Sequence, residues 1–175
     1  SVQSMTNTST SDAEATITQI KELARLGAEI VRVSIPDEDA AGALEQIVEE
    51  SPVPLVADIH FRADLALRAL EAGIHKLRLN PGNIRREEDI RTIASLASAR
   101  RVPIRIGVNS GSVPGDLREK HGGVNRDSMW GAAERHVKLL EKHGFHDIVL
   151  SLKASDPMLT VDVNRLASEL SPYPL

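Results

Sequence analysis

The sequence predicts an α/β fold built as a TIM-barrel-type (β/α) parallel barrel, and three observations support this prediction. Strand and helix patterns alternate along all 175 residues, as in parallel strands joined by crossover helices. Aromatic residues form only 2% of the chain, so the core must be aliphatic, which suits helices packed on parallel strands. Charged side chains also recur on one face of successive strands, and a barrel interior accommodates them better than an open sheet covered by helices on both faces.

Start and stop signals delimit the elements in the first half of the chain. Ser11 or Asp12 can cap the first helix, and Gly27 can end it in a left-handed turn. Apolar residues then recur at steps of three and four in each helix, whereas the strands are short apolar runs. The predicted helices cover residues 11–27, 36–50 and 65–73, and the strands cover residues 2–6, 30–34, 56–60 and 76–80.

The second half continues the same alternation. A turn at Pro81-Gly82-Asn83 precedes a further helix, and the Gly- and Ser-containing stretch from Ser110 to Gly123 is predicted to be a long loop. The predicted helices lie around residues 90–97, 129–144 and 161–170, and the predicted strands lie at 104–109 and 148–153. Residues 171–175 are predicted to form a linker into one more strand.

Alternation of side chains along each strand separates a packing face from a chemical face. The packing face is aliphatic. The other face carries Arg32, Asp58, His60, Arg78, Asn80, Arg105, Asn109 and Lys153. Because the carboxyl ends of barrel strands meet at one mouth, we expect these side chains to converge there.

The charge on this face indicates an anionic ligand. Four cations, contributed by Arg32, Arg78, Arg105 and Lys153, face the single carboxylate of Asp58. Burying such an excess without counter-charge would cost several kcal/mol per ion. Guanidinium groups bind phosphate oxygens bidentately, and several cations at one mouth favour a diphosphate over a monophosphate.

The remaining polar groups suggest the chemistry. Asn80 and Asn109 could bind sugar-like hydroxyls, and Asp58 and His60 could bind hydroxyls or move a proton. An alternative is that Arg and Asp only pair across layers of the barrel as structural ion pairs. The other histidines are expected on the surface, and their spacing does not resemble a metal site; they are His75, His121, His136, His143 and His146.

Composition limits the class of protein. A net charge of -4 argues against nucleic-acid binding, and no membrane span or signal peptide is visible, so we expect a soluble cytoplasmic protein. The absence of Cys excludes disulfides and thiolate metal ligands within these residues. Eight βα units need about 200 residues, and about six are found here. We therefore expect residues 1–175 to be a single barrel domain, truncated at both ends.

Five segments in chain order resemble the 4-hydroxy-3-methylbut-2-en-1-yl diphosphate synthase family of non-mevalonate isoprenoid biosynthesis. They are VQSMTN at 2–7, VADIHF at 56–61, LRLNPGN at 77–83, RIGVNSGS at 105–112 and SLKASD at 151–156. The resemblance implies a dihydropteroate-synthase-like barrel joined to a C-terminal domain with a [4Fe-4S] cluster. It implies reductive conversion of 2-C-methyl-D-erythritol 2,4-cyclodiphosphate to 4-hydroxy-3-methylbut-2-enyl diphosphate, with ferredoxin or flavodoxin as electron donor, in a homodimer.

The resemblance also implies roles for individual residues. The three arginines and Lys153 would hold the diphosphate, while Asp58, His60, Asn80 and Asn109 would lie near the substrate carbon skeleton. Gln3, Met5 and Thr6 belong to a matching motif without an assigned role. The family's cluster ligands, three Cys and a Glu, have no counterpart here, so we expect this chain to bind no metal and to be inactive alone.

Two other functions remain open from the residues. A phosphate-binding barrel lyase or aldolase could use Lys153 as a Schiff-base nucleophile, and borohydride trapping with a carbonyl substrate would detect the imine. A barrel that only binds an anion or a protein partner would have no need for Asp58 and His60.

Overall fold

The structure is a computed structural model that describes residues 1–60, 62–79, 84 and 86–175. The strands are β1 (Gln3–Met5), β2 (Ile30–Ser34), β3 (Leu55–Ile59), β4 (Lys76–Leu79), β5 (Ile104–Asn109) and β6 (Ile148–Lys153). The helices are α1 (Ala13–Arg25), α2 (Glu38–Glu50), α3 (Ala63–Glu71), α4 (Glu87–Arg100), the 3₁₀ turn η1 (Ser110–Ser112), α5 (Gly115–Lys120), α6 (Arg126–Lys142) and α7 (Pro157–Leu170).

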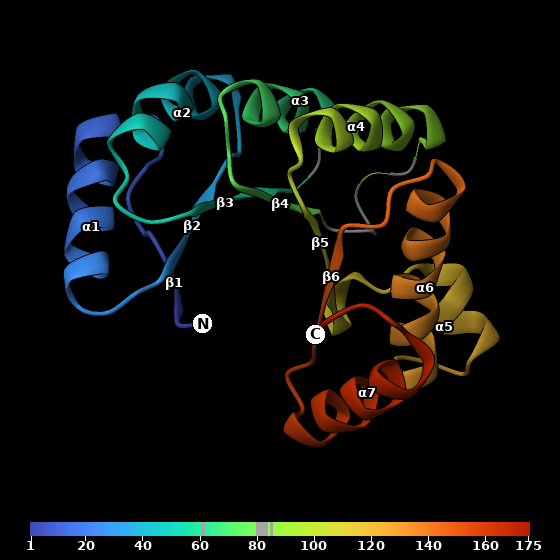
Figure 1. The fold of residues 1–175 in the computed structure, drawn as a ribbon. Coiled ribbons are helices and arrows are strands. Elements are labelled where there is room, and N and C mark those ends of the chain that lie inside the picture. The colour runs from blue at the N-terminus through green and yellow to red at the C-terminus, as the bar shows by residue number, and fades with distance from the viewer. Residues whose placement is uncertain (61, 80–83, 85) are drawn as a thin grey trace.

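The described strands form one parallel sheet in the order β1-β2-β3-β4-β5-β6. The sheet curls into a half-barrel, with the helices along its convex side and its concave side open (Figure 1). Sequential strand order with a helix in each connection is the pattern of a (β/α) barrel. The predicted fold class is therefore confirmed.

The hydrophobic core lies between the convex face of the sheet and the helices. Every apolar strand residue predicted for the packing face is buried, with at most 4% of its surface exposed: Val31, Val33, Ala57, Ile59, Leu77, Leu79, Ile104, Ile106, Val108, Ile148, Leu150 and Leu152. The helices meet them with aliphatic side chains such as Ile20, Leu44 and Leu70. This division leaves the opposite strand face to polar residues.

Helix starts and ends follow the predicted signals. Asp12 caps α1 by accepting a hydrogen bond from the amide of Ala15 at 3.0 Å, and Gly27 follows the helix with a φ of 100°. The helix α7 begins at Pro157, four residues before the predicted start, because Asp156 caps it and proline suits the first helical turn. Residues 171–175 lie beside β6, where Leu150 donates a backbone hydrogen bond to Pro174 at 2.8 Å.

The prediction of a long loop between Ser110 and Gly123 is wrong. This segment contains η1 and α5. Ser112 Oγ closes the first turn by donating to the carbonyl of Asn109 at 2.9 Å. The short α5 is stabilised by tertiary contacts, since Leu117 is buried and Asp116 pairs with Arg135 on α6. Six residues give too few helical repeats for a periodic sequence signal.

The prediction that all the remaining histidines lie on the surface is wrong for His136. Its side chain is 8% exposed, and its Nε2 lies 3.4 Å from the carbonyl oxygen of Ile84. Burial lowers the pKa of His136 to about 4. The residue therefore packs as a neutral side chain within the fold.

No helix in the described part of the chain combines the length and apolarity that crossing a bilayer requires.

Candidate anion-binding site on the concave face

Strand register brings the predicted charged residues to the concave face. Asp58 on β3 pairs in register with Arg78 on β4, and Arg78 with Arg105 on β5. Residues paired across neighbouring parallel strands point to the same face of a sheet. These side chains therefore share the face opposite the helices, as the alternation of residues predicts.

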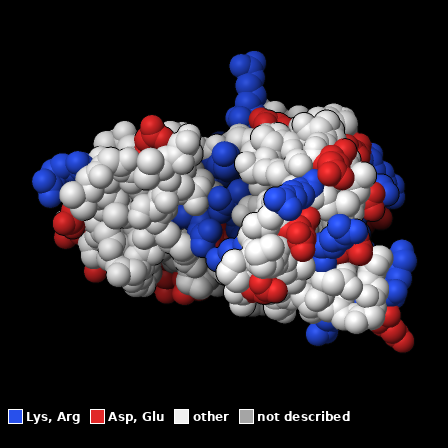
Figure 2. Space-filling view, turned by 90° about the horizontal axis from the view of Figure 1, so that it is seen from below, with Lys and Arg blue, Asp and Glu red and all other residues white. Residues whose placement is uncertain are grey.

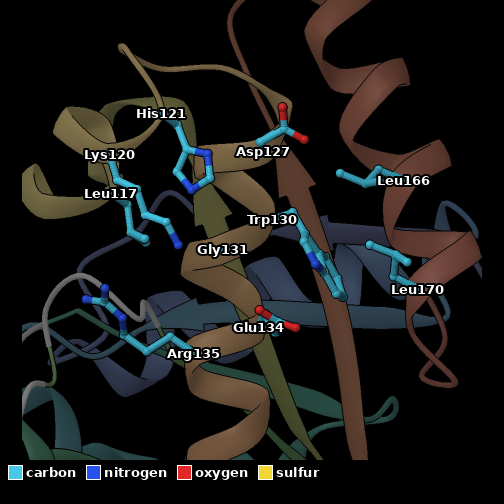
Figure 3. Close-up of a pocket in the computed structure, with 10 residues that line it drawn as sticks. All are labelled: Leu117, Lys120, His121, Asp127, Trp130, Gly131, Glu134, Arg135, Leu166 and Leu170. Carbon is cyan, nitrogen blue, oxygen red and sulfur yellow. The ribbon is translucent and has the colours of Figure 1, made fainter.

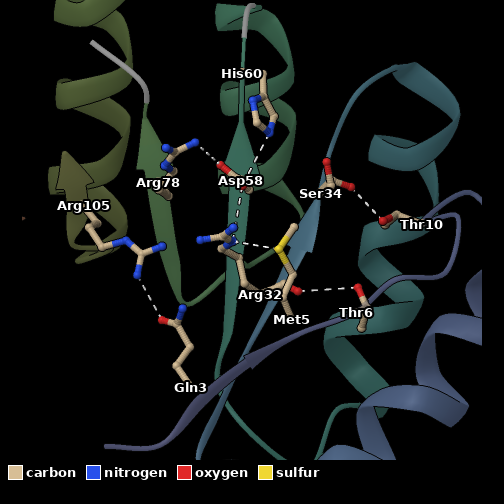
Figure 4. Close-up of polar contacts among 10 residues, drawn as sticks. All are labelled: Gln3, Met5, Thr6, Thr10, Arg32, Ser34, Asp58, His60, Arg78 and Arg105. Carbon is tan, nitrogen blue, oxygen red and sulfur yellow. Dashed lines mark hydrogen bonds and ion pairs between the residues drawn. The ribbon is translucent and has the colours of Figure 1, made fainter. Parts of the chain in front are cut away.

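Asp58 lies at the centre of this face and is 1% exposed. Its Oδ1 accepts a hydrogen bond from Arg78 Nη1 at 2.7 Å. Its Oδ2 lies 3.3 Å from Arg32 Nε and 3.5 Å from His60 Nε2 (Figure 4). One buried carboxylate thus holds side chains from β2, β4 and the end of β3 in one cluster.

The three arginines of the cluster differ in environment. Arg78 is buried, and its Nη1 is paired with Asp58. Arg32 is 27% exposed along its side chain, and its Nε also lies 3.2 Å from Met5 Sδ. Arg105 has no carboxylate partner among the described residues, and its Nη1 donates to the neutral amide oxygen of Gln3 at 3.1 Å.

Arg105 therefore carries the least compensated charge of the cluster. Burial, followed by the charges of Arg32 and Arg78, lowers the pKa of Arg105. Its Nε is buried and finds no hydrogen-bond partner in the described parts of the chain. A guanidinium that lies beside other positive charges and has an unpaired N–H donor is suited to binding an anion.

Gln3 and Met5 were not predicted as site residues, although they belong to a motif quoted for the family resemblance. Both lie on β1 with their side chains on the concave face, within contact of Arg105 and Arg32 (Figure 4). Their spacing of two along a strand was the available signal. The predicted site draws its charged and amide residues from the strands at residue 30 onward, so the strand predicted at 2–6 contributes no residue to it.

Two further predicted residues lie on the last two strands of the described sheet. Asn109 and Lys153 pair in register at the ends of β5 and β6. Lys153 is exposed, and no described contact joins its amino group to the three arginines. Asn80 lies outside the described residues.

A space-filling view of the open side shows basic side chains gathered in the central hollow (Figure 2). The three cluster arginines face only one carboxylate there, so two positive charges remain uncompensated among the described side chains of this cluster (three minus one). Such an arrangement attracts anions and raises their local concentration.

A second hollow, of about 400 Å³, lies on the outside between α5, α6 and α7. It is lined by Trp130, Leu166 and Leu170 together with charged groups (Figure 3). Its Arg135 is already paired with Asp116, and Glu134 with Lys138. The described residues offer no group of three His, Asp or Glu side chains that could hold a metal ion.

The fold and the concave face define the class: a parallel (β/α) barrel domain with a basic, solvent-open interior. Residues 1–175 match the GcpE TIM-barrel domain, and the chain belongs to that family.

Curated relatives carry the name 4-hydroxy-3-methylbut-2-en-1-yl diphosphate synthase (flavodoxin). The chain is 49% identical to the protein of Caldanaerobacter subterraneus subsp. tengcongensis, 51% to that of Thermodesulfovibrio yellowstonii and 50% to that of Haemophilus influenzae, over 99% of its own length. It covers 49%, 50% and 50% of these proteins respectively. The chain thus spans about half the length of the curated relatives it matches.

Solved structures share the fold at low identity. Dihydropteroate synthase from Yersinia pestis superposes with a TM-score of 0.62 at 15% identity, over 97% of this chain and 65% of that one. A truncated 3-deoxy-D-arabino-heptulosonate 7-phosphate synthase from Thermotoga maritima gives 0.61 at 13% identity, over 99% and 61%. These similarities establish the barrel architecture alone.

Proposed function

We propose that this chain is the substrate-binding barrel of a 4-hydroxy-3-methylbut-2-en-1-yl diphosphate synthase. In this proposal the barrel binds 2-C-methyl-D-erythritol 2,4-cyclodiphosphate in the cytoplasm, and the enzyme opens the ring with two electrons and eliminates water. The observation that carries the proposal is the cluster of three arginines around one carboxylate, in a chain about half identical to synthases of that name.

The proposed roles follow the environments of the side chains. Arg105 and Arg32, with incomplete compensation, would contact the diphosphate oxygens, and Lys153 would add a charge at the mouth. Arg78 and Asp58 are buried against each other, so they would position the other groups. His60, partly exposed beside Asp58, would donate a proton to the departing oxygen. Asn109 and Asn80 would bind substrate hydroxyls.

The [4Fe-4S] cluster of the proposed enzyme would have to be held outside this barrel. Such clusters are bound by Cys thiolates, and these 175 residues contain no Cys. The described residues therefore do not fit the cluster, and we assign none of them a step through it. The relatives' name supports flavodoxin as the electron donor. A homodimeric assembly is part of the same proposal.

Calorimetric titration of this chain with the cyclic diphosphate, at low salt, tests the binding role. We expect saturable binding that Arg105→Ala weakens and that Arg91→Ala, on the outer helix α4, leaves unchanged. Absence of heat with the wild-type chain would contradict the proposal.

A chimaera tests the activity. Residues 1–175 would replace the matching segment of the Haemophilus influenzae synthase, which is 50% identical. Turnover of the cyclic diphosphate with reduced flavodoxin is expected for the chimaera and not for this chain alone. A folded, cluster-loaded chimaera that binds but never converts the substrate would contradict the enzymatic role.

A further inference from the structure

We propose that Gly107 is a positioning residue, whose missing side chain provides the space in which the Arg78 guanidinium lies against Asp58. No role for a glycine in strand β5 follows from charge or from strand periodicity. The inference about geometry stands on the structure, and only its effect on ligand binding rests on the proposed function.

The Arg78 side chain spans three strands. It starts on β4, reaches Asp58 on β3 with Nη1, and covers Gly107 on β5 with the rest of its guanidinium. A Cβ atom built on Gly107 would lie 2.5 Å from Arg78 Nε, 2.9 Å from Nη2 and 3.0 Å from Cζ. Carbon and nitrogen atoms do not approach so closely without displacement, so any residue other than glycine would push the guanidinium away.

Backbone geometry does not explain this glycine. Gly107 is not among the residues with positive φ, and it pairs in regular register with Ser151 on β6. A glycine inside a strand is destabilising relative to alanine, because its backbone loses more conformational freedom on folding. The remaining reason for glycine at this position is the close approach of another group, and Arg78 supplies that group.

Displacing Arg78 would disturb the whole cluster, because Asp58 connects its members. Asp58 is 1% exposed, so water cannot readily replace the Arg78 hydrogen bond. The other carboxylate oxygen faces Arg32 and His60. A methyl group at position 107 would therefore alter the orientation of side chains that it does not touch.

Nitrogen-15 NMR of arginine side chains tests the geometry without any ligand. In the wild-type chain the buried Arg78 Nε–H should give a slowly exchanging signal, assigned by its loss in Arg78→Lys. Gly107→Ala should shift this signal or abolish its protection. Gly42→Ala is the control, since a Cβ there meets nothing within 4 Å. An unchanged Arg78 signal in Gly107→Ala would overturn the proposal.

Titration with pyrophosphate tests the consequence for binding. Gly107→Ala should weaken affinity about tenfold, the equivalent of one lost charge-assisted hydrogen bond. In the Arg78→Lys background the same change should have a much smaller further effect, because no guanidinium plane covers position 107. Equal effects of Gly107→Ala in the two backgrounds would contradict the proposal.

The outcomes separate this inference from the proposed function. If wild-type chain binds neither pyrophosphate nor the cyclic diphosphate while Gly107→Ala still alters the Arg78 signal, the positioning role stands and the proposed function fails. If Gly107→Ala does not fold, the proposal is tested by whether the double variant Arg78→Lys/Gly107→Ala folds. Recovery of folded protein supports the steric role of Arg78, and continued failure to fold contradicts it.

Discussion

The amide oxygen of Gln3 accepts a hydrogen bond at 3.1 Å from a guanidinium nitrogen of Arg105, 102 residues later in the chain. The two residues lie on β1 and β5, which are not neighbours in the sheet. Only a strongly curled sheet lets side chains from these strands meet across its concave face. The contact fixes the Arg105 side chain and, because glutamine is neutral, leaves its charge available to a ligand.

The first prediction concerns the buried carboxylate. Asp58→Asn should lower the free energy of unfolding by about 3 kcal/mol, because it leaves Arg78 buried without a counter-charge. Urea denaturation measures this difference. The control is Asp64→Asn, which makes the same chemical change at an exposed ion pair with Arg62. Equal stability losses at the two positions would show that Asp58 is not the electrostatic centre of the cluster.

Arg105→Ala should weaken pyrophosphate binding about ten- to a hundredfold, the range expected for one charge-assisted contact. The free energy of unfolding should change little, since Arg105 has only a neutral partner among the described side chains. Calorimetry and urea denaturation of the same samples separate the two effects. Wild-type affinity in the Arg105→Ala variant would show that Arg105 does not contribute to the binding site.

Salt should weaken anion binding by this chain. Arg32 is partly exposed and the concave face is open, so mobile ions can screen the cluster, with a screening length that falls from about 10 Å at 0.1 M to about 3 Å at 1 M. Pyrophosphate titrations over this range should show a steady loss of affinity. Affinity that does not depend on salt would indicate a site closed to solvent.

His60→Ala should lower kcat of the chimaeric enzyme about a hundredfold and change KM little, because demand for the proton is greatest in the transition state. Steady-state kinetics with the cyclic diphosphate measures both constants. His146→Ala, in the exposed loop before β6, is the matched control. A selective rise in KM would instead assign His60 to ground-state binding.

His136 should make the fold sensitive to acid. Its pKa of about 4 lies below the ordinary value of 6.5, so between these values the unfolded chain binds a proton that the folded chain does not. The stabilisation is complete above about pH 6.5 and is lost as pH falls toward 4. His136→Gln should reduce the loss of stability between pH 7 and 5 by about 2 kcal/mol. Urea denaturation curves that fall in parallel for both proteins would contradict this assignment.

The succession of strands and helices could be predicted from local pattern because its signals lie within a few residues. Asp12 caps α1 through an amide three residues away, and Gly27 supplies the left-handed turn after it. The two faces of each strand could also be predicted from local pattern. Once Val31 and Val33 are assigned to the core, Arg32 must point the other way, since side chains alternate along a strand.

Short elements held by distant contacts could not be predicted in this way. The helix α5 depends on Leu117 entering the core and on Asp116 meeting Arg135, nineteen positions away in sequence. His136 is buried because α6 packs beside Ile84. In both cases the stabilising partner is remote along the chain, so the local sequence pattern does not indicate it.

By itself the sequence determined the order of the elements, the aliphatic core and the set of charged residues on the opposite strand face, because each depends on periodicity within one element. Tertiary structure decided how those charges combine. Asp58 holds Arg78 and Arg32, Gln3 meets Arg105 across the sheet, and Gly107 lies beneath Arg78. These contacts join different strands, so they exist only once the sheet has taken its register and curvature.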